Sequence, residues 1–340
     1  MQFVIFGAGA VGGAVGARLH QAGCDVTLIA RGPHFEAIKR EGLRFETPVE
    51  RVVLELPVVN DPAAVTWRED HVVLLVVKSQ DTASALDSLR VAAPPSLPIV
   101  CLQNGVENER LALRMFATVY AGVVMLPAAH LEPGLVQAYG AALTGIIDVG
   151  RYPNGADERC DAIVGALAGA GLRSSARPDV MRSKYAKLIV NLGNAVHALC
   201  APGARSEELI ELAGNEGRAA LRAAGIAFAA EEVQDVRGRW ERMQVQGIGG
   251  QERAGSSTWQ SLARGTRALE TDYLNGEISL LGRLHEVPTP VNDTLCQLAD
   301  RLARERAAPG QLSPEDVFAQ LSSRHTDSTG GGRDAATVPG

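Results

Sequence analysis

The sequence predicts an α/β protein in which an N-terminal, doubly wound parallel sheet is followed by an all-helical C-terminal domain. In the first half, short continuous runs of Val, Ile and Leu alternate with helical patterns, as expected for parallel strands buried on both faces. A glycine-rich turn directly follows the first of these runs. After about residue 155, strand-like runs largely disappear and long helical patterns replace them.

The apolar runs of the first half are the expected strands. They lie at 3–6, 26–29, 72–77 and 99–102, and further strand patterns lie at 119–125, 135–139 and 145–149. Between the first two runs, Val11, Val15 and Leu19 recur at i, i+4 spacing, which predicts a helix that ends near Gly23. The resulting strand–helix–strand unit indicates a doubly wound sheet.

The second half contains Ala- and Leu-rich helical patterns with charged faces, at 157–171, 178–200, 206–224, 256–285 and 290–306. We predict a dinucleotide-binding domain over 1–172 and a helical substrate domain over 173–321. The boundary falls where Ser174 and Ser175 precede Arg177-Pro178, and Pro178-Asp179 is the expected helix start. Residues 322–340 are rich in Ser, Thr and Gly and predict a disordered tail.

Composition excludes several classes of protein. The 340 residues, 46% hydrophobic and 21% charged, predict a globular chain of about two domains. A net charge of −6 gives no global basic field for nucleic acid, and no apolar run reaches the roughly 18 residues of a membrane span. The first residues do not resemble a signal peptide, and the five scattered Cys lack metal-site spacing. We therefore expect a cytoplasmic protein without a metal site.

Lysine is rare in this chain. Of 33 Lys and Arg residues, 29 are Arg and only four are Lys, namely Lys39, Lys78, Lys184 and Lys187. Arg stays charged at accessible pH, whereas a Lys amine can release a proton. A site that transfers a proton therefore cannot replace Lys with Arg, and the few remaining lysines are candidates for such a site.

The turn Gly7-Ala8-Gly9-Ala10-Val11-Gly12 matches the G-x-G-x-x-G pattern of dinucleotide-binding folds. Gly7 permits the tight turn, Gly9 allows the backbone to approach a pyrophosphate, and Gly12 lets the helix pack against the strand. The helix N-terminus offers free N–H groups to the anion. The alternative is a tight strand–helix turn without a ligand.

Arg31 selects between the two nicotinamide cofactors. An NAD site normally places Asp or Glu after the second strand, but this chain has Ala30-Arg31-Gly32 there. Because Arg can bind a 2′-phosphate through charge-assisted hydrogen bonds, the sequence favours NADPH. Alternatively, Arg31 is a solvated loop charge.

Polar residues follow two further strands. Lys78 and Asn104 stand just after apolar runs, where side chains of such folds reach a cofactor or substrate. A surface lysine and an Asn-Gly turn are the respective alternatives.

A polar face is expected in the helix over 178–200. Lys184, Lys187, Asn191 and Asn194 follow one another at spacings of 3, 4 and 3, which places all four on one face. Their apolar neighbours indicate a buried helix, so these polar groups require partners or a ligand. The alternative is an ordinary solvent-facing side. Further along, the pattern alone selects neither the Ser256-Ser257 helix start nor the acid Glu270.

Taken together, these motifs resemble the 2-dehydropantoate 2-reductase (ketopantoate reductase) family from Met1 to about Arg301. The resemblance rests on the glycine turn with Arg31, on Lys78, on Gln103-Asn104-Gly105-Val106 and on Lys187-Leu188 with Asn191. In the C-terminal part it rests on Ser256-Ser257 with Gln260, and on Glu270 with Asp272 and Asn275-Gly276. The resemblance implies a Rossmann-type domain and a helical domain with the active site in the cleft between them.

The resemblance also implies the reaction and its residues. The family reduces a 2-oxo acid to a 2-hydroxy acid with NADPH, here ketopantoate to pantoate in pantothenate and coenzyme A biosynthesis. Its catalytic lysine falls on Lys187 and its acidic partner on Glu270. Substrate contacts fall on Asn191 and Ser257, and Asn194 joins them through the shared face. Asn104 falls where the family contacts both cofactor and substrate, and Ala128 falls near a backbone contact to the cofactor.

Hydride attack on a ketone develops negative charge on oxygen, which a lysine ammonium stabilises before it donates a proton. This is the role expected of Lys187. On the substrate side the chain departs from the family, which usually has Asn-Pro-x-Thr where this chain has Asn194-Ala195-Val196-His197. One extra residue also lies between Gln260 and Glu270, and a further Asn of the family has no counterpart near Gly203.

Three functions therefore stay open. The first is the reduction of ketopantoate, and the second is a related NADP-dependent reductase or dehydrogenase acting on another carbonyl compound. The third is an NADPH-binding sensor without turnover, which the presence of Lys187 and Glu270 disfavours. We expect a small-molecule substrate and neither a nucleic-acid nor a membrane partner. The helical domain is a candidate for homodimer formation, although no spacing requires it.

Overall fold

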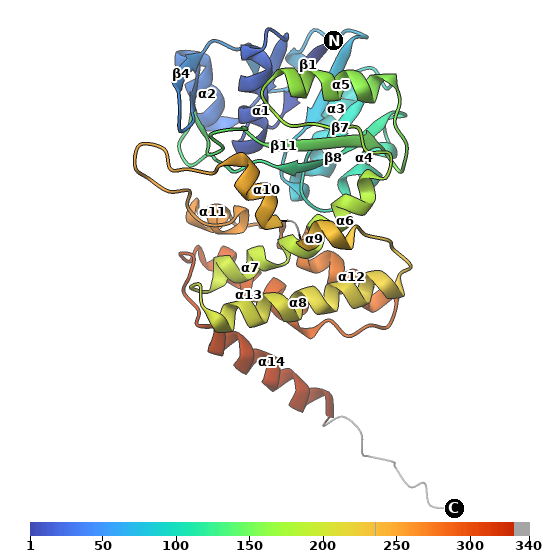
Figure 1. Cartoon of the computed structure of the whole chain (residues 1–340), viewed down its shortest axis with the longest axis vertical. Coiled ribbons are helices and arrows are strands. Elements are labelled where there is room, and N and C mark those ends of the chain that lie inside the picture. The colour runs from blue at the N-terminus through green and yellow to red at the C-terminus, as the bar shows by residue number, and fades with distance from the viewer. Residues whose placement is uncertain (235, 330–340) are drawn as a thin grey trace, which may run out of the picture. The chain divides into compact units, whose positions relative to one another are not determined.

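The computed structural model describes residues 1–234 and 236–329, which form two compact units (Figure 1). The first unit comprises Met1–Asn191 and Ile226–Ala254, and the second comprises Leu192–Gly225 and the described residues from Gly255 onwards. Strands and helices build the first unit, whereas the described elements of the second are helical. The predicted combination of a doubly wound sheet and a helical region is thus confirmed. Among the described residues, no helix is long and apolar enough to cross a membrane.

The main sheet lies in the first unit and, within the described residues, has seven strands. In spatial order they are β11 (Ile146–Arg151), β8 (Val119–Met125), β7 (Ile99–Cys101), β6 (His71–Leu75), β1 (Gln2–Phe6), β2 (Val26–Ile29) and β5 (Val58–Val59). All pair in parallel except β11, which is antiparallel to β8. The chain leaves β1 for β2 on one side and later returns to β6 on the other, which creates the switch point where such sheets bind ligands.

Apolar side chains of β1 point alternately to the two faces of the sheet, which explains why helices cover both faces (Figure 1). Phe3 and Ile5 face one apolar core, which α1 (Ala10–Gln21) and α5 (Glu158–Gly169) complete. Val4 and Phe6 face a second core, completed by α3 (Thr82–Ala92) and α4 (Asn108–Leu113). Strands buried on both faces need continuous apolar sequence, which is the pattern that predicted them.

The register places the carboxyl ends of the parallel strands at one edge. Phe6 pairs with Leu75, Leu75 with Cys101, and Cys101 with Ala121, so these residues form a row across β1, β6, β7 and β8. The segments that follow β1, β6 and β7 therefore leave the sheet on the same side. Strands β6 and β7 end at Leu75 and Cys101, slightly earlier than the predicted 77 and 102.

A second, four-stranded sheet packs against α1 in the first unit. Its order within the described chain is β4 (Arg51–Leu54), β3 (Leu43–Glu46), β10 (Leu135–Ala138) and β9 (Ala128–Ala129). The sequence predicted only β10. The others are two to four residues long, and charged residues interrupt β3 and β4, so their apolar periodicity is too short to detect.

The predicted helix over 178–200 is divided, which corrects the shared polar face. Helix α6 (Val180–Asn191) ends one residue before Leu192, and α7 (Gly193–Leu199) belongs to the second unit. Asn194 therefore lies on a different helix from Lys184, Lys187 and Asn191. A Cβ on Gly193 would lie 3.2 Å from the Ile210 side chain, so close packing of α7 on α8 (Ala204–Ala223) explains a glycine with weak helix propensity at this point.

The predicted helical segment over 256–285 is also divided. It forms α11 (Ser257–Ala263), the 3₁₀ turn η3 (Glu270–Tyr273) and α12 (Asn275–Leu284). Gly265, with φ +68°, lies just after the end of α11, in a backbone conformation that favours glycine.

The remaining helices have the following bounds: α2 (Gly32–Glu41), α9 (Ala230–Gln234), α10 (Val236–Met243), α13 (Pro290–Glu305), α14 (Pro314–Thr329), and the 3₁₀ turns η1 (Pro62–Ala64) and η2 (Ser79–Asp81). Because α14 continues to Thr329, residues 322–329 are helical and not the predicted disordered tail. The rest of that prediction, 330–340, lies outside the described residues.

The first segment of the first compact unit continues to Asn191, past the predicted boundary between residues 172 and 173. The reason is packing, because Val180 and Met181 at the start of α6 contact Ala121 and Val123 of β8. The chain also returns to the first unit through α9 and α10. The assignment of cofactor binding to residues 1–172 and of substrate binding to residues 173–321 stays a prediction.

Candidate active site

Two positions of the glycine turn after β1 can hold only a residue without a Cβ. Gly7 has φ +107°, and a Cβ there would lie 2.7 Å from the backbone N of Val77. A Cβ on Gly12 would lie 2.1 Å from the carbonyl oxygen of Gly7. Both positions therefore require glycine because the turn, the neighbouring strand and α1 pack in direct contact.

Gly9 has a different role from these two glycines. A Cβ at Gly9 would meet no atom within 4 Å, so packing within the protein does not demand a glycine there. Gly9 is also the N-cap of α1, and no side chain caps the helix. Open space beside uncapped N–H groups suits a phosphate that approaches the backbone closely, so the turn fits a dinucleotide pyrophosphate.

A buried histidine that the sequence did not single out holds this turn. The Nε2–H of His34 donates to the carbonyl oxygen of Ala8 at 2.8 Å, and its Nδ1 accepts from the Gly134 N–H at 2.9 Å. This arrangement requires the neutral ring. The pKa of His34 is lowered to about 4, mainly by burial and in addition by the His130 ring, whose centroid is 4.0 Å away.

Arg31 lies where the sequence placed it, close to the end of β2. It is exposed, serves as the N-cap residue of α2, and its guanidinium carbon lies 5.9 Å from the centroid of the Phe6 ring. The side chain is thus available to a phosphate at the carboxyl edge of the sheet.

The segments that follow β6 and β7 are joined by hydrogen bonds. Lys78 is half-buried at the start of η2, and the neighbouring Ser79 Oγ donates to the carbonyl oxygen of Asn104 at 3.3 Å. Asn108 Nδ2 donates to the same carbonyl at 3.0 Å and to Ser79 Oγ at 3.3 Å. Lys78 and Asn104 therefore belong to two strand-end segments that support each other.

Lys187 contacts Asn104, a pairing that the sequence did not predict although it singled out both residues. Lys187 Nζ donates to Asn104 Oδ1 at 2.7 Å and also to the carbonyl oxygen of Val124 in β8. Asn104 follows β7 and Val124 lies beyond Ala121 in β8, so the amine lies at the carboxyl edge of the sheet. The glycine turn lies at this same edge.

One helical turn earlier, Lys184 forms a buried ion pair. Its Nζ donates to Glu109 and, at 3.1 Å, to the carbonyl oxygen of Gln103. The side chains of Lys184 and Glu109 are only 3% and 0% exposed. Burial raises the pKa of the Glu109 carboxyl, and the Lys184 ammonium opposes this by favouring the charged form. For Lys184, the interpretation as a solvent-facing residue is therefore wrong.

Lys184 also fixes the segment that presents Asn104. The Gln103 carbonyl that it binds immediately precedes Asn104, and Glu109 lies in α4 just after it. Nothing in the sequence signalled Glu109, since a charge in a short helix is ordinary. The pair emerges only when α6 packs on β8 and β11.

Two further predicted residues of the first unit have clear positions. Asn191, the last residue of α6, is buried, and its Nδ2 has no hydrogen-bond partner among the described residues. A buried amide donor of this kind is costly unless a ligand pairs with it. Ala128 is buried in β9, where it pairs with Ala138, and its contact with a cofactor stays a prediction.

Asn194, Ser257 and Glu270 lie in the second unit. Ser256, the N-cap of α11, accepts from the Trp259 N–H and donates to the carbonyl oxygen of Asn194 at 3.1 Å, so Asn194 lies beside the start of α11 and Ser257. Glu270 is buried in η3. Burial lowers the pKa of the Arg264 guanidinium, and the nearby Glu270 carboxylate opposes this.

The predicted residues thus form two groups within their own units. In the first unit, the glycine turn, Arg31, Lys78, Asn104 and Lys187 gather around one edge of the sheet. In the second, Asn194 and Ser257 are neighbours, and Glu270 lies near Arg264. His197 is exposed on α7. The sequence missed Glu109 and His34, which act through contacts between distant segments.

Comparison with known proteins identifies the family to which the chain is similar. A family model described as Ketopantoate reductase PanE/ApbA matches residues 3–154, and one described as Ketopantoate reductase PanE/ApbA C terminal matches residues 179–303. The 2-dehydropantoate 2-reductase of Archaeoglobus fulgidus is 31% identical over 86% of this chain and 95% of its own. That of Mesorhizobium japonicum is 30% identical over 90% of this chain and 99% of its own.

Solved structures agree with this. A PanE/ApbA family ketopantoate reductase from Ralstonia eutropha JMP134 aligns with a TM-score of 0.75 at 30% identity, covering 90% of this chain and 99% of that one. A D-mandelate dehydrogenase solved with NADH and anilino(oxo)acetate aligns with a TM-score of 0.79 at 24% identity over the same shares of the two chains, which shows a common fold.

The resemblance drawn from the motifs is thereby confirmed over both halves of the chain. The glycine turn, Arg31 and Asn104 lie within the first matched region, and Lys187, Ser257 and Glu270 lie within the second. This chain is therefore an oxidoreductase that belongs to the ketopantoate reductase family.

Proposed function

We propose that this protein reduces a 2-oxo acid to a 2-hydroxy acid with NADPH, with ketopantoate as the leading substrate and pantoate as its product. The observation that carries the proposal is the position of the Lys187 amine. It is held by Asn104 Oδ1 and the Val124 carbonyl at the sheet edge that also carries the glycine turn. A proton donor and a dinucleotide-binding turn at one edge are the two parts that a carbonyl reductase needs.

The residues at this edge fit a nicotinamide dinucleotide. Gly9 leaves open space at the uncapped start of α1 for the pyrophosphate, and His34 fixes the adjoining backbone at Ala8. The exposed Arg31 favours a 2′-phosphate, and hence NADPH over NADH. Lys78, Asn104 and Ala128 are further candidates for cofactor contact. When bound, NADPH supplies a hydride to the substrate carbonyl carbon.

Lys187 supplies the proton. As the carbonyl carbon accepts the hydride, negative charge develops on its oxygen, and an ammonium within hydrogen-bond distance stabilises that charge. Lys187 then donates its proton to this oxygen, which completes the hydroxyl group. Asn104 orients the amine through its Oδ1, so the donor is in place before the substrate arrives. We propose Glu270 as the acidic partner of Lys187.

Polar groups of both units are proposed to contact the substrate. Asn191 offers a buried amide donor without a partner in the described structure, which suits a carboxylate or carbonyl oxygen of a 2-oxo acid. Ser257 and Asn194 are proposed as further contacts with the substrate. The Asn194-Ala195-Val196-His197 segment lacks the family's Asn-Pro-x-Thr pattern, which favours a different 2-oxo acid as the second candidate. A fold shared with a D-mandelate dehydrogenase does not by itself select ketopantoate.

A panel of 2-oxo acids tests these alternatives directly. NADPH oxidation is followed with ketopantoate, its smaller and larger homologues, and aromatic 2-oxo acids, each at several concentrations. The highest kcat/KM with ketopantoate supports the first candidate, and a clear preference for another 2-oxo acid supports the second. Tight NADPH binding without turnover of any member contradicts the reductase proposal and favours a sensor. A cytoplasmic location and a homodimer stay predictions.

A further inference from the structure

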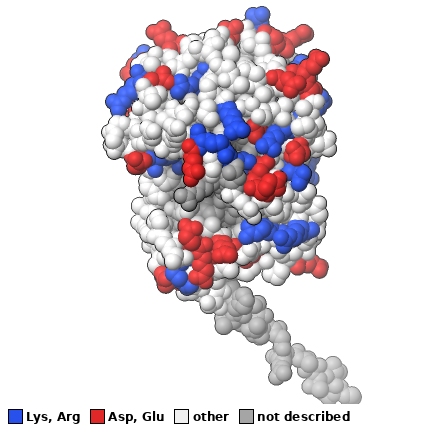
Figure 2. Space-filling model, in the orientation of Figure 1, with Lys and Arg blue, Asp and Glu red and all other residues white. Residues whose placement is uncertain are grey.

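A cavity lined with arginines lies in the first unit, on the antiparallel edge of the main sheet. Its volume is about 470 Å³. Its lining consists of Ile146, Asp148, Arg173, Ser175, Arg177, Arg239 and Arg242. In Figure 2, Lys and Arg side chains gather over the region of β11 and α10, with acidic side chains beside them. A cavity of this size matches those that hold small ligands.

Strand periodicity explains why three of these side chains face the same way. Residues 173–177 run beside β11, where Arg173 pairs with Ile146 and Ala176 with Val149, both in parallel. The Arg173 carbonyl accepts from the Ile147 N–H at 2.8 Å, and the Arg177 N–H donates to the Val149 carbonyl at 2.8 Å. Since side chains alternate along an extended segment, positions 173, 175 and 177 share one face.

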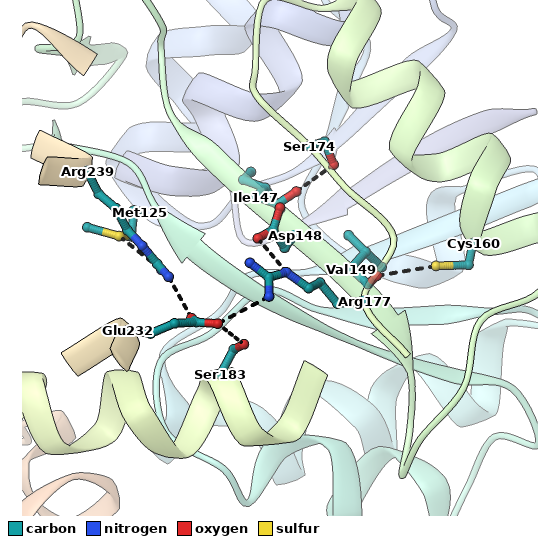
Figure 3. Close-up of polar contacts among 10 residues, drawn as sticks. All are labelled: Met125, Ile147, Asp148, Val149, Cys160, Ser174, Arg177, Ser183, Glu232 and Arg239. Carbon is teal, nitrogen blue, oxygen red and sulfur yellow. Dashed lines mark hydrogen bonds and ion pairs between the residues drawn. The ribbon is translucent and has the colours of Figure 1, made fainter. Parts of the chain in front are cut away.

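Helix α10 supplies the other two arginines. Arg239 and Arg242 are three residues apart, so they lie on one side of this helix. Arg239 NH2 donates to Glu232 Oε2 at 2.6 Å, and Arg177 NH1 donates to Glu232 Oε1 at 3.2 Å. Figure 3 shows Glu232 reached by Arg177 and Arg239 from two directions, with Ser183 as a third donor at 2.8 Å.

The described carboxylates beside this cavity pair with some of its arginines but not with Arg173. Arg177 and Arg239 contact two of them, Asp148 in the lining and Glu232 beside it, and Arg177 Nε donates to Asp148 Oδ2 at 3.2 Å (Figure 3). Arg173 makes no ion pair or side-chain hydrogen bond with any other described residue, and it is exposed. An exposed arginine without an internal ion pair, with three further guanidinium groups around the same cavity, is an attractive site for an anion.

We propose that this cavity binds a small phosphate-bearing anion, such as a phosphate ester or a pyrophosphate, at a site separate from the dinucleotide turn. Guanidinium groups match phosphate oxygens with paired, charge-assisted hydrogen bonds, and four of them around one cavity can contact several oxygens at once. Strand β11 lies four strands from β1 in the sheet, which is roughly 19 Å at the usual strand spacing. The glycine turn and this cavity can therefore be occupied at the same time.

Isothermal titration calorimetry of the full-length protein with inorganic pyrophosphate, without divalent cations, tests the proposal. It is carried out with and without saturating NADP⁺, so that binding at the glycine turn is blocked in one arm. Saturable binding is expected in both arms. Arg173→Gln and Arg242→Gln are each expected to weaken it by about tenfold or more, the effect of losing a charge-assisted hydrogen bond. The matched control is Arg114→Gln, another exposed arginine of the first unit.

Every other outcome overturns the proposal. These outcomes are no binding, loss of binding in the presence of NADP⁺, an equal effect of Arg114→Gln, and tighter binding of citrate than of pyrophosphate. Circular dichroism and thermal melting of each variant separate a folding defect from a binding defect. The readout does not depend on turnover, so it stands whether or not the protein reduces ketopantoate. Without pyrophosphate, Arg173→Gln is expected to oxidise NADPH at the wild-type rate.

Discussion

Lys187 Nζ lies 2.7 Å from Asn104 Oδ1, although 83 residues separate the two in the chain. The contact forms because α6 packs across β8 while Asn104 leaves the neighbouring β7 at its carboxyl end. One turn earlier on the same helix, Lys184 binds the carbonyl of Gln103, the residue before Asn104. Two lysines of α6 thus secure the same segment, one as the proposed proton donor and the other as its support.

Lys187→Arg is expected to lower kcat by about 10² to 10⁴-fold, the usual contribution of a general acid. Arg keeps the positive charge but does not release a proton, so the fold and the NADPH affinity should be retained. Steady-state kinetics and fluorescence titration of NADPH measure these effects. Lys39→Arg, at an exposed position, is the matched control. Wild-type turnover in Lys187→Arg would remove Lys187 from the proton-transfer role.

Arg31→Asp is expected to reverse the cofactor preference. The guanidinium that favours the 2′-phosphate is replaced by a carboxylate that repels it, so kcat/KM for NADPH should fall by about tenfold or more. The value for NADH should change little. Arg40→Asp, further along α2 and also exposed, is the control. An unchanged NADPH to NADH ratio in Arg31→Asp would show that this arginine is only a solvated charge.

Gly9→Ala and Gly12→Ala separate ligand binding from folding. At Gly9 a methyl group meets nothing within 4 Å, so the free energy of unfolding should hardly change. Loss of a close backbone–phosphate contact should weaken NADPH binding by about tenfold or more. At Gly12 the methyl group would meet the Gly7 carbonyl at 2.1 Å, so stability itself should fall. Urea unfolding and NADPH titration measure both, and normal NADPH affinity in Gly9→Ala would exclude the proposed approach.

Lys184→Met is expected to lower the free energy of unfolding by about 3–5 kcal/mol, because it leaves the Glu109 carboxylate buried without its cation. The double variant Lys184→Met/Glu109→Leu should recover most of this loss, since both charges are then absent. Urea unfolding of the single and double variants completes the cycle. Lys39→Met should change stability little. If both single and double variants lose equal stability, lost packing and not the uncompensated charge is responsible.

His34 predicts a pH dependence of stability. Its pKa is about 4 in the folded protein and 6.5 when unperturbed, so between these values the unfolded chain binds a proton that the folded protein does not. The stability that depends on neutral His34 is present above pH 6.5 and is lost as pH falls towards 4, by up to about 3 kcal/mol. Unfolding measured from pH 7 to 4 should show a flatter curve for His34→Gln. The exposed His197→Gln should follow the wild type, and an identical slope in His34→Gln would contradict the assignment.

Much of the first unit was predictable because its strands are buried on both faces. Continuous apolar runs identified β1, β2, β6, β7 and β8, and the glycine spacing identified the turn. Prediction failed where the local signal was short or ambiguous. Strands β3 and β4 carry charges, and the helical pattern over 178–200 did not reveal the interruption at Leu192, since the apolar residues continue through it.

The sequence by itself determined the fold class, the family, the glycine turn and the few lysines worth considering, because each depends on residue type or on spacing within one segment. Only the tertiary structure decided what those lysines contact. It placed Lys187 against Asn104, paired Lys184 with Glu109, and set His34 beneath the turn. It also assembled four arginines from two distant segments around one cavity. Such contacts join residues tens of positions apart, and they exist only once packing has fixed which helix lies on which strand.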